Sequence, residues 1–283
     1  MQEFFSYTFV QHALIAAVFA SIVCAIVGTL IVINQLVFLA GGVAHAAYGG
    51  VGAAVTLRLP LMPTLLCFTS ASALLMGGLT ARRRERTEVL IGALWAAGMA
   101  SGILMLDFSN GYNVDLMSYL FGSMLAVSTF DLWIMGGVVA LIIVLAVWLY
   151  DEFLLISFDM EYARTRRVPV KMIYTVLLLM TAFSTVVMIR VVGIILTIAL
   201  LTVPPFIGMR YANRLWKMMV ISGVSALIFC IGGLLGAYFI DVTASAAIIV
   251  LETATLGVIL AGEKVVELWR KRRVKSAFAR LNQ

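Results

Sequence analysis

The chain contains little charge. Aspartate, glutamate, lysine and arginine make up 12% of its 283 residues, about half of the roughly 25% that is typical of soluble domains. Hydrophobic residues make up 63%, which excludes a soluble globular protein. Several stretches of about twenty residues carry almost no charge, the length that crosses a hydrocarbon core about 30 Å thick. Because a backbone in lipid must satisfy its own hydrogen bonds, we expect these continuous stretches to be helices.

Several features that would carry chemistry are also lacking. The three cysteines, Cys24, Cys67 and Cys230, fall in apolar runs without metal-binding or disulfide spacing, so we expect buried apolar filler. No phosphate-binding G-x-x-x-x-G-K-[ST] motif is present, so any ATP must be hydrolysed by another chain. We therefore expect neither enzymatic activity nor a cofactor. The first eighteen residues lack a basic segment and a cleavage site, and we expect them to begin the mature protein.

The apolar runs predict an all-α, polytopic integral membrane protein with about eight or nine transmembrane helices. Two segments leave alternatives open. The runs beside Arg190 fit two spans or one span plus a broken helix, and Tyr119–Ser128 fits a short or partly embedded helix. We expect a membrane domain over 1–263 and a basic cytoplasmic tail over 264–283. The candidate spans are 10–33, 37–58, 61–80, 89–106, 132–150, 172–189, 192–209, 218–239 and 243–262.

The net charge of +6 is concentrated in a few connections and in the tail. If the spans alternate in direction, the basic clusters at 82–86, 164–171, 210–217 and 270–280 all lie on one side. The positive-inside rule assigns that side to the cytoplasm and the N-terminus to the outside. The acidic loops around Asp107, Asp115 and Asp241 then face outward. The basic residues thus indicate membrane orientation, and we expect no nucleic-acid partner.

The segment from Val37 to Val55 is apolar enough to lie in a membrane, yet it carries His45 at its centre. Gly41 and Gly49 stand four residues before and after it, on the same face of a helix. An ionisable side chain at this depth is costly and points to a functional site. Because neutral imidazole suits zinc, manganese or iron(II), His45 is a candidate metal-pathway ligand. The alternative is a histidine hydrogen-bonded to a carbonyl of a neighbouring helix.

Glu252 lies about midway along the last span, where a carboxylate is costly unless it is paired or faces water. It is the second candidate pathway ligand, and the alternative is pairing with a polar group on another helix. His12 lies near a span end, as an interfacial polar residue would. Arg58 and Arg190 are expected to be snorkelling or loop charges.

The longest polar cytoplasmic connection is SFDMEYARTRRVPVK, residues 157–171. Its acids come early and its basic residues late, which suits the dipole of a short helix. Phe158, Tyr162 and Val168 supply apolar contacts. This pattern favours a short amphipathic element that docks a partner, and the alternative is an ordinary interfacial loop.

Four stretches, in the same order, resemble the permease subunits of ABC importers for zinc, manganese and iron. The FDMEYA stretch is similar to the coupling helix of that family. The family often has Arg-Arg where this chain has Asn34 and Gln35, and glycine where it has Arg166 and Arg167. It commonly has an acid four residues before the core histidine, where this chain has Gly41. The four stretches are LIVINQLVFLAGGVAHAAYGGVG (30–52), YLFGSMLAVSTFDL (119–132), FDMEYA (158–163) and VVGIILTIALLTVPPFIGMRYA (191–212).

The resemblance implies an inner-membrane permease that forms a homodimer, binds a cytoplasmic ABC ATPase and receives a cation from an extracytoplasmic metal-binding protein. On the pathway, only His45 carries over from the family motif. The alternatives are an ABC permease for a non-metal solute, a stand-alone secondary transporter, or a scaffold without transport activity. A secondary transporter is less favoured because the sequence shows no convincing internal repeat. The resemblance assigns ATPase coupling to Phe158, Asp159, Glu161 and Ala163, and we expect the adjoining basic residue Arg164 to take part as well.

Overall fold

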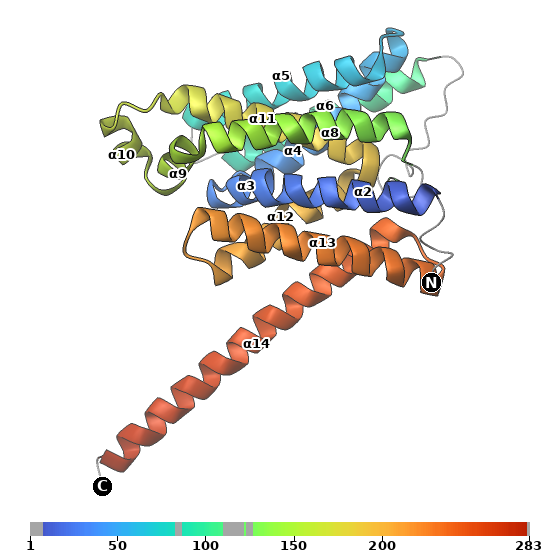
Figure 1. The fold of residues 1–283 in the computed structure, drawn as a ribbon. Coiled ribbons are helices and arrows are strands. Elements are labelled where there is room, and N and C mark those ends of the chain that lie inside the picture. Colours follow the sequence, from blue (N-terminus) through green and yellow to red (C-terminus); the bar gives the residue numbers. More distant parts are fainter. Residues whose placement is uncertain (1–7, 83–86, 110–121, 123–126, 282–283) are drawn as a thin grey trace.

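The computed structural model describes residues 8–82, 87–109, 122 and 127–281, and the regular elements within these ranges are helices (Figure 1). They are α2 (Thr8–Val23), the π-helix η1 (Cys24–Gly28), α3 (Thr29–Ile33), α4 (Val37–Thr56), α5 (Leu61–Arg82), α6 (Thr87–Asp107), α8 (Thr129–Trp148), α9 (Tyr150–Phe158), α10 (Met160–Thr165), α11 (Val170–Val192), α12 (Ile194–Tyr211), α13 (Leu215–Ile240) and α14 (Ala244–Leu281).

Nine helical segments in the described ranges are long and apolar enough to cross a membrane. Helices α2, η1 and α3 together form the first span, Thr8–Ile33, and each expected span matches one of the nine. The prediction of an all-α polytopic membrane protein is therefore confirmed. The two runs beside Arg190 are separate helices, α11 and α12, divided at Gly193. Most of the stretch 119–128 lies outside the described residues, whereas the proposed tail continues α14 as far as Leu281.

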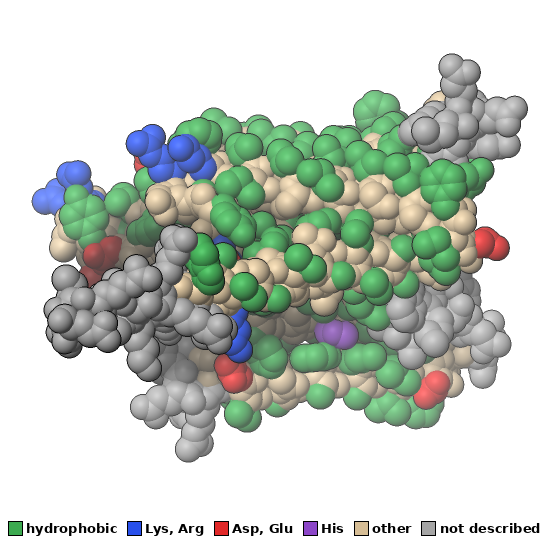
Figure 2. Space-filling view, turned by 90° about the horizontal axis from the view of Figure 1, so that it is seen from below, with side chains coloured by type: hydrophobic (Ala, Val, Ile, Leu, Met, Phe, Trp, Pro, Cys, Tyr) green, Lys and Arg blue, Asp and Glu red, His purple; other side chains and the backbone are tan. Residues whose placement is uncertain are grey.

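The two ends of the bundle differ in charge. Figure 1 places α9 and α10 at the same end as the α3–α4 turn, and the α13–α14 connection at the opposite end. Figure 2 shows lysine and arginine gathered at the α10 end, hydrophobic side chains over the middle, and a histidine in a hollow between the ends. This distribution agrees with a cytoplasmic α10 end. Arg83, Arg84, Arg86 and Asp115 lie outside the described residues.

The π-helix η1 of the first span packs on α12, which contains two adjacent prolines. Pro204 has no backbone N–H, so the Leu200 carbonyl loses its usual helical donor. The Cys24 thiol, in η1, donates a hydrogen bond of 2.7 Å to that carbonyl oxygen. Gly28 packs so closely that a Cβ would lie 2.7 Å from Pro205 Cγ. Cys24 and Cys230 are buried as expected, whereas the expectation was wrong for Cys67, which is exposed. Cys24 also has a polar role, because it donates to the carbonyl that the proline leaves without a helical donor.

Helix α4 packs on α6 through facing small residues. A Cβ on Gly52 would lie 2.7 Å from the Gly102 Cα, and one on Gly49 would lie 2.8 Å from the Gly98 carbonyl oxygen. Small residues allow helix backbones to approach this closely. The contact holds α6 beside the helix that carries His45.

Within the described residues, four helices are each followed by a residue other than glycine in the left-handed conformation. These residues are Gln35, Arg58, Arg167 and Asp241, with φ between 54° and 60°. After α3, the Leu36 amide donates to the Ile31 carbonyl at 2.8 Å, which closes a Schellman turn around Gln35. Glycine adopts this conformation without a steric cost. Arg167, which follows α10, therefore holds a conformation that a glycine would adopt without this cost.

Gly122 and Gly193, from two of the resembling stretches, meet where α11 passes into α12. Both have positive φ, 61° and 84°. A Cβ on Gly122 would lie 2.8 Å from the Gly193 Cα. The backbone conformation and the close approach therefore both require glycine at position 122.

Candidate functional site

His45 lies midway along α4 and is half-buried. Its ring stacks on Trp95 of α6, with centroids 4.3 Å apart and planes inclined by 19°. Phe38 meets Trp95 edge-on, with centroids 6.3 Å apart. The His45 Nδ1 atom is buried, and it has no hydrogen-bond partner among the residues that the structure describes. The expected alternative, a carbonyl partner on a neighbouring helix, is thus not found for Nδ1 within those residues.

The face of α4 is open one turn before His45. Among the described atoms, a Cβ on Gly41 would have one neighbour within 4 Å, Ile198 Cδ1 at 4.0 Å. On the adjacent Gly42, by contrast, a Cβ would lie 2.6 Å from Ile91 Cγ2. Position 41 therefore has room for a side chain, on the same face of the helix as His45. The acid common in the resembling proteins could be accommodated here without repacking the helix backbones.

Glu252 is completely buried on the inner face of α14. Neither of its carboxylate oxygens has a hydrogen-bond partner within the described ranges. His45 lies on α4, whereas Glu252 lies on α14, and α12 packs on both of these helices. No group of three or more histidine, cysteine or acidic side chains suited to a metal ion occurs in the part of the chain that the structure describes. The structure thus does not gather His45 and Glu252 into one ligand cluster.

Two polar contacts fasten the outer end of α8. The His12 ring donates from Nδ1 to the Val127 carbonyl oxygen at 3.0 Å, which links α2 to the residue before the α8 cap. Ser128 and Asp131 form a capping box, and Arg190 of α11 donates from Nε to Asp131 Oδ1 at 3.1 Å. Sequence reasoning missed this partner of Arg190. The Ser-x-x-Asp spacing predicts the cap but does not identify the arginine.

Helix α10 is held in place by two of the five predicted coupling residues. Asp159 is its N-cap, and its carboxylate accepts a hydrogen bond of 2.9 Å from the Tyr162 amide. Ala163 is completely buried and is part of the main hydrophobic core. These two residues therefore position the short helix, and Ala163 is not accessible to a partner.

The other three predicted coupling residues form an exposed surface at the end of the bundle. Phe158 is 58% exposed, beside Tyr162 at 47%. Glu161 and Arg164 form an ion pair of 2.8 Å with side chains 82% and 61% exposed. An apolar centre with an exposed ion pair beside it is a surface suited to docking another protein.

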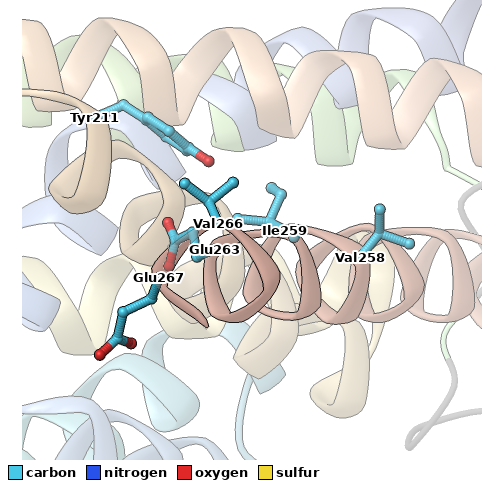
Figure 3. Close-up of a pocket in the computed structure, with 7 residues that line it drawn as sticks. Tyr211, Val258, Ile259, Glu263, Val266 and Glu267 are labelled. Carbon is cyan, nitrogen blue, oxygen red and sulfur yellow. The ribbon is translucent and has the colours of Figure 1, made fainter. Parts of the chain in front are cut away.

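At the same end of the molecule, a groove of about 530 Å³ lies between the end of α12 and α14. Figure 3 shows Tyr211 facing α14 across it, above Val266 and Ile259. Glu263 lines the groove and pairs with Arg210 of α12. This ion pair ties the two helices together where α14 leaves the bundle.

Comparison with known proteins gives consistent matches along the chain. Residues 6–262 match the family described as the ABC 3 transport family. An uncharacterized membrane protein of Synechocystis is 41% identical over 249 residues, 88% of this chain and 89% of that protein. The manganese transport system membrane protein MntC of Halalkalibacterium halodurans is 32% identical over 254 residues, 90% of this chain and 87% of that protein.

A solved structure is similar as well. The structure of PsaBC from Streptococcus pneumoniae in complex with Fab contains a chain that matches with a TM-score of 0.80 and 28% identity. The match covers 90% of this chain and 91% of that one. The family resemblance is therefore supported by sequence and by fold over nearly the same length.

Proposed function

This chain belongs to the ABC 3 transport family, and from that premise we propose that it is the membrane-spanning permease of an ATP-driven importer for a divalent transition-metal cation. It is a transport subunit of the inner membrane, and ATP is hydrolysed by a separate ATPase chain. Manganese is the favoured substrate because the name of the MntC relative specifies it. Zinc and iron(II) are the other candidates, since both also accept an imidazole ligand.

The observation that carries the pathway proposal is the His45 Nδ1 atom, which has no hydrogen-bond partner among the described residues and lies one turn from the open position at Gly41. One imidazole cannot hold a cation alone. A two-fold homodimer would bring two copies together, and water or backbone carbonyls would complete a weak site. A weak site is suitable because a conduction site must also release its ion. Glu252 remains a predicted second ligand, and α12–α14 would have to rearrange before its enclosed oxygens could reach a cation.

The proposed transport cycle starts at α10. Closure of the ATPase pair pushes the surface of Phe158, Glu161 and Arg164, and the spans rock between outward and inward access. An extracytoplasmic binding protein delivers the cation, which passes His45. A permease for a non-metal solute would also be driven through α10. Variants at His45 and Gly41 are therefore needed to test whether the substrate is a metal ion.

The pathway is tested with permease, ATPase and binding protein reconstituted in vesicles. We expect His45→Ala to lower manganese uptake about tenfold or more, the loss seen even when outer-sphere partners of metal ligands are removed. Gly41→Asp should strengthen uptake at limiting manganese, while the equally sized Gly41→Asn should not. Full uptake by His45→Ala, together with identical behaviour of the two Gly41 variants, would refute the pathway. Uphill uptake by vesicles that contain this chain alone would refute the ATP-driven mechanism.

ATPase docking is tested by co-purification. Glu161→Arg breaks the exposed ion pair with Arg164 and reverses the charge at position 161. We expect the ATPase no longer to co-purify with this variant, while membrane insertion is retained. Glu88→Arg, at an exposed acid in the first turn of α6, is the matched control and should retain the ATPase. Unchanged co-purification of Glu161→Arg would count against docking at α10.

A further inference from the structure

A hydrogen bond joins α9, the helix that leads into α10, to the turn that precedes α4. The Asn34 side chain donates from Nδ2 to the Ser157 hydroxyl oxygen at 2.8 Å. The same nitrogen donates to the Leu30 carbonyl oxygen, also at 2.8 Å. Because a side-chain amide has two N–H donors, both bonds form together. Asn34 thereby fastens the end of α3 to the last turn of α9.

Each side of this bond leads directly to one part of the proposed transport machinery. Ser157 stands two residues before Asp159, the N-cap of α10. Asn34 stands three residues before Val37, the first residue of α4. His45 lies eight residues farther along the same helix, about 12 Å at a rise of about 1.5 Å per residue. No long flexible linker separates the docking surface from the histidine.

We propose that Asn34 and Ser157 are positioning residues for transport, whose hydrogen bond transmits the displacement of α10 to α4 and so to His45. The proposal rests on the function proposed above. Helix α9 also packs on α3 and α11, but apolar contacts are non-directional and allow sliding. The strength of a hydrogen bond depends on its distance and angle. The bond between Asn34 and Ser157 therefore fixes the position of α9 relative to the α3–α4 turn.

The Asn34 side chain also has a local role, because its second hydrogen bond, to the Leu30 carbonyl, caps α3. A variant at Ser157 separates the two roles. Ser157→Ala removes the contact between helices and leaves the bond from Asn34 to Leu30 in place. Ser157→Thr keeps a hydroxyl and serves as the conservative rescue. Thr175→Val is the matched control, because the exposed Thr175 hydroxyl donates to the Lys171 carbonyl within α11, outside the docking helix.

The experiment measures manganese uptake and ATP hydrolysis by the complete transporter in vesicles. We expect Ser157→Ala to bind and activate the ATPase normally but to move about fivefold less manganese per ATP, the effect of losing one neutral hydrogen bond. Ser157→Thr and Thr175→Val should keep the uptake-to-hydrolysis ratio of the starting protein. Asn34→Ala should lower it as far as Ser157→Ala does, and the double variant should lower it no further.

An unchanged ratio in Ser157→Ala would overturn the proposal. Equal losses of uptake and hydrolysis would overturn it as well, since a merely structural role predicts that result. A starting protein that binds no ATPase would refute the proposed function itself, and this proposal with it. The two failures are therefore distinguished by the behaviour of the unaltered transporter.

Discussion

Removal of the Cys24 thiol should cost more stability than the volume of the thiol explains. Cys24 and Leu200 are both completely buried, and the thiol donates to the carbonyl whose helical donor Pro204 has removed. Cys24→Ala would leave that carbonyl oxygen without its donor at membrane depth. A buried acceptor without a partner costs about 1–3 kcal/mol, in addition to the cavity that the sulfur leaves.

Cys230→Ala is the control for the cavity. Cys230 is also completely buried, on the neighbouring helix α13, so the same change of volume is made without removing the bond to Leu200. The difference in free energy of unfolding between the two variants measures the polar contacts of the Cys24 thiol, which are the bond to Leu200 and a longer contact of 3.6 Å with the Ser222 hydroxyl. We expect about 1–2 kcal/mol. Cys24→Ser keeps a donor at the position and should lose less than Cys24→Ala.

A double-mutant cycle with Pro204→Ala tests the cause. Alanine restores an N–H at position 204, so Leu200 regains a helical donor and the excess cost of Cys24→Ala should disappear. Unfolding in mixed micelles with a rising fraction of SDS, followed by tryptophan fluorescence, gives the free energies. Equal losses for Cys24→Ala and Cys230→Ala, or a Cys24 penalty that persists beside Pro204→Ala, would refute the reasoning.

The same titration tests two further features. Gln35→Gly should raise the free energy of unfolding by about 1 kcal/mol because it relieves a left-handed conformation, and Gln35→Val should lower it; equal stability of the two variants would contradict this. Gly52→Ala would place a Cβ 2.7 Å from the Gly102 Cα, so it should cost about 1–3 kcal/mol by overpacking. Gly137→Ala, where the described atoms leave open space within 4 Å, should be nearly neutral, and equal losses would count against close packing of α4 on α6.

The spans could be predicted from the sequence because the signal for each is local. A run of apolar residues specifies a membrane helix by itself, and the basic residues between runs specify its direction. His45 was identified for the same reason, as an ionisable residue inside an apolar run. The separation of α11 from α12 was not determined in this way, because it depends on the backbone conformation at Gly193 rather than on hydropathy.

The side-chain contacts that fix how the helices pack join residues far apart in sequence. Cys24 and Leu200 are separated by 176 residues, and Asn34 and Ser157 by 123. Hydropathy predicts that Cys24 is buried but not that Pro204 leaves a carbonyl facing it. The resemblance likewise identified Ala163 as a coupling residue, whereas its burial shows that it holds α10 in place. Such roles depend on tertiary packing, which no single segment specifies.

The arrangement around His45 also limits what one subunit can do. Within the described ranges it offers one unpaired imidazole nitrogen and an open position at Gly41, and Glu252 is enclosed elsewhere. A metal ion that needs four to six ligands would therefore be held weakly by one copy of the chain. On the proposed function this weakness is useful, because selectivity is then left to the binding protein and to pairing of two subunits. It follows that Gly41→Asp should strengthen binding but slow release, so uptake at saturating manganese should fall while uptake at limiting manganese rises.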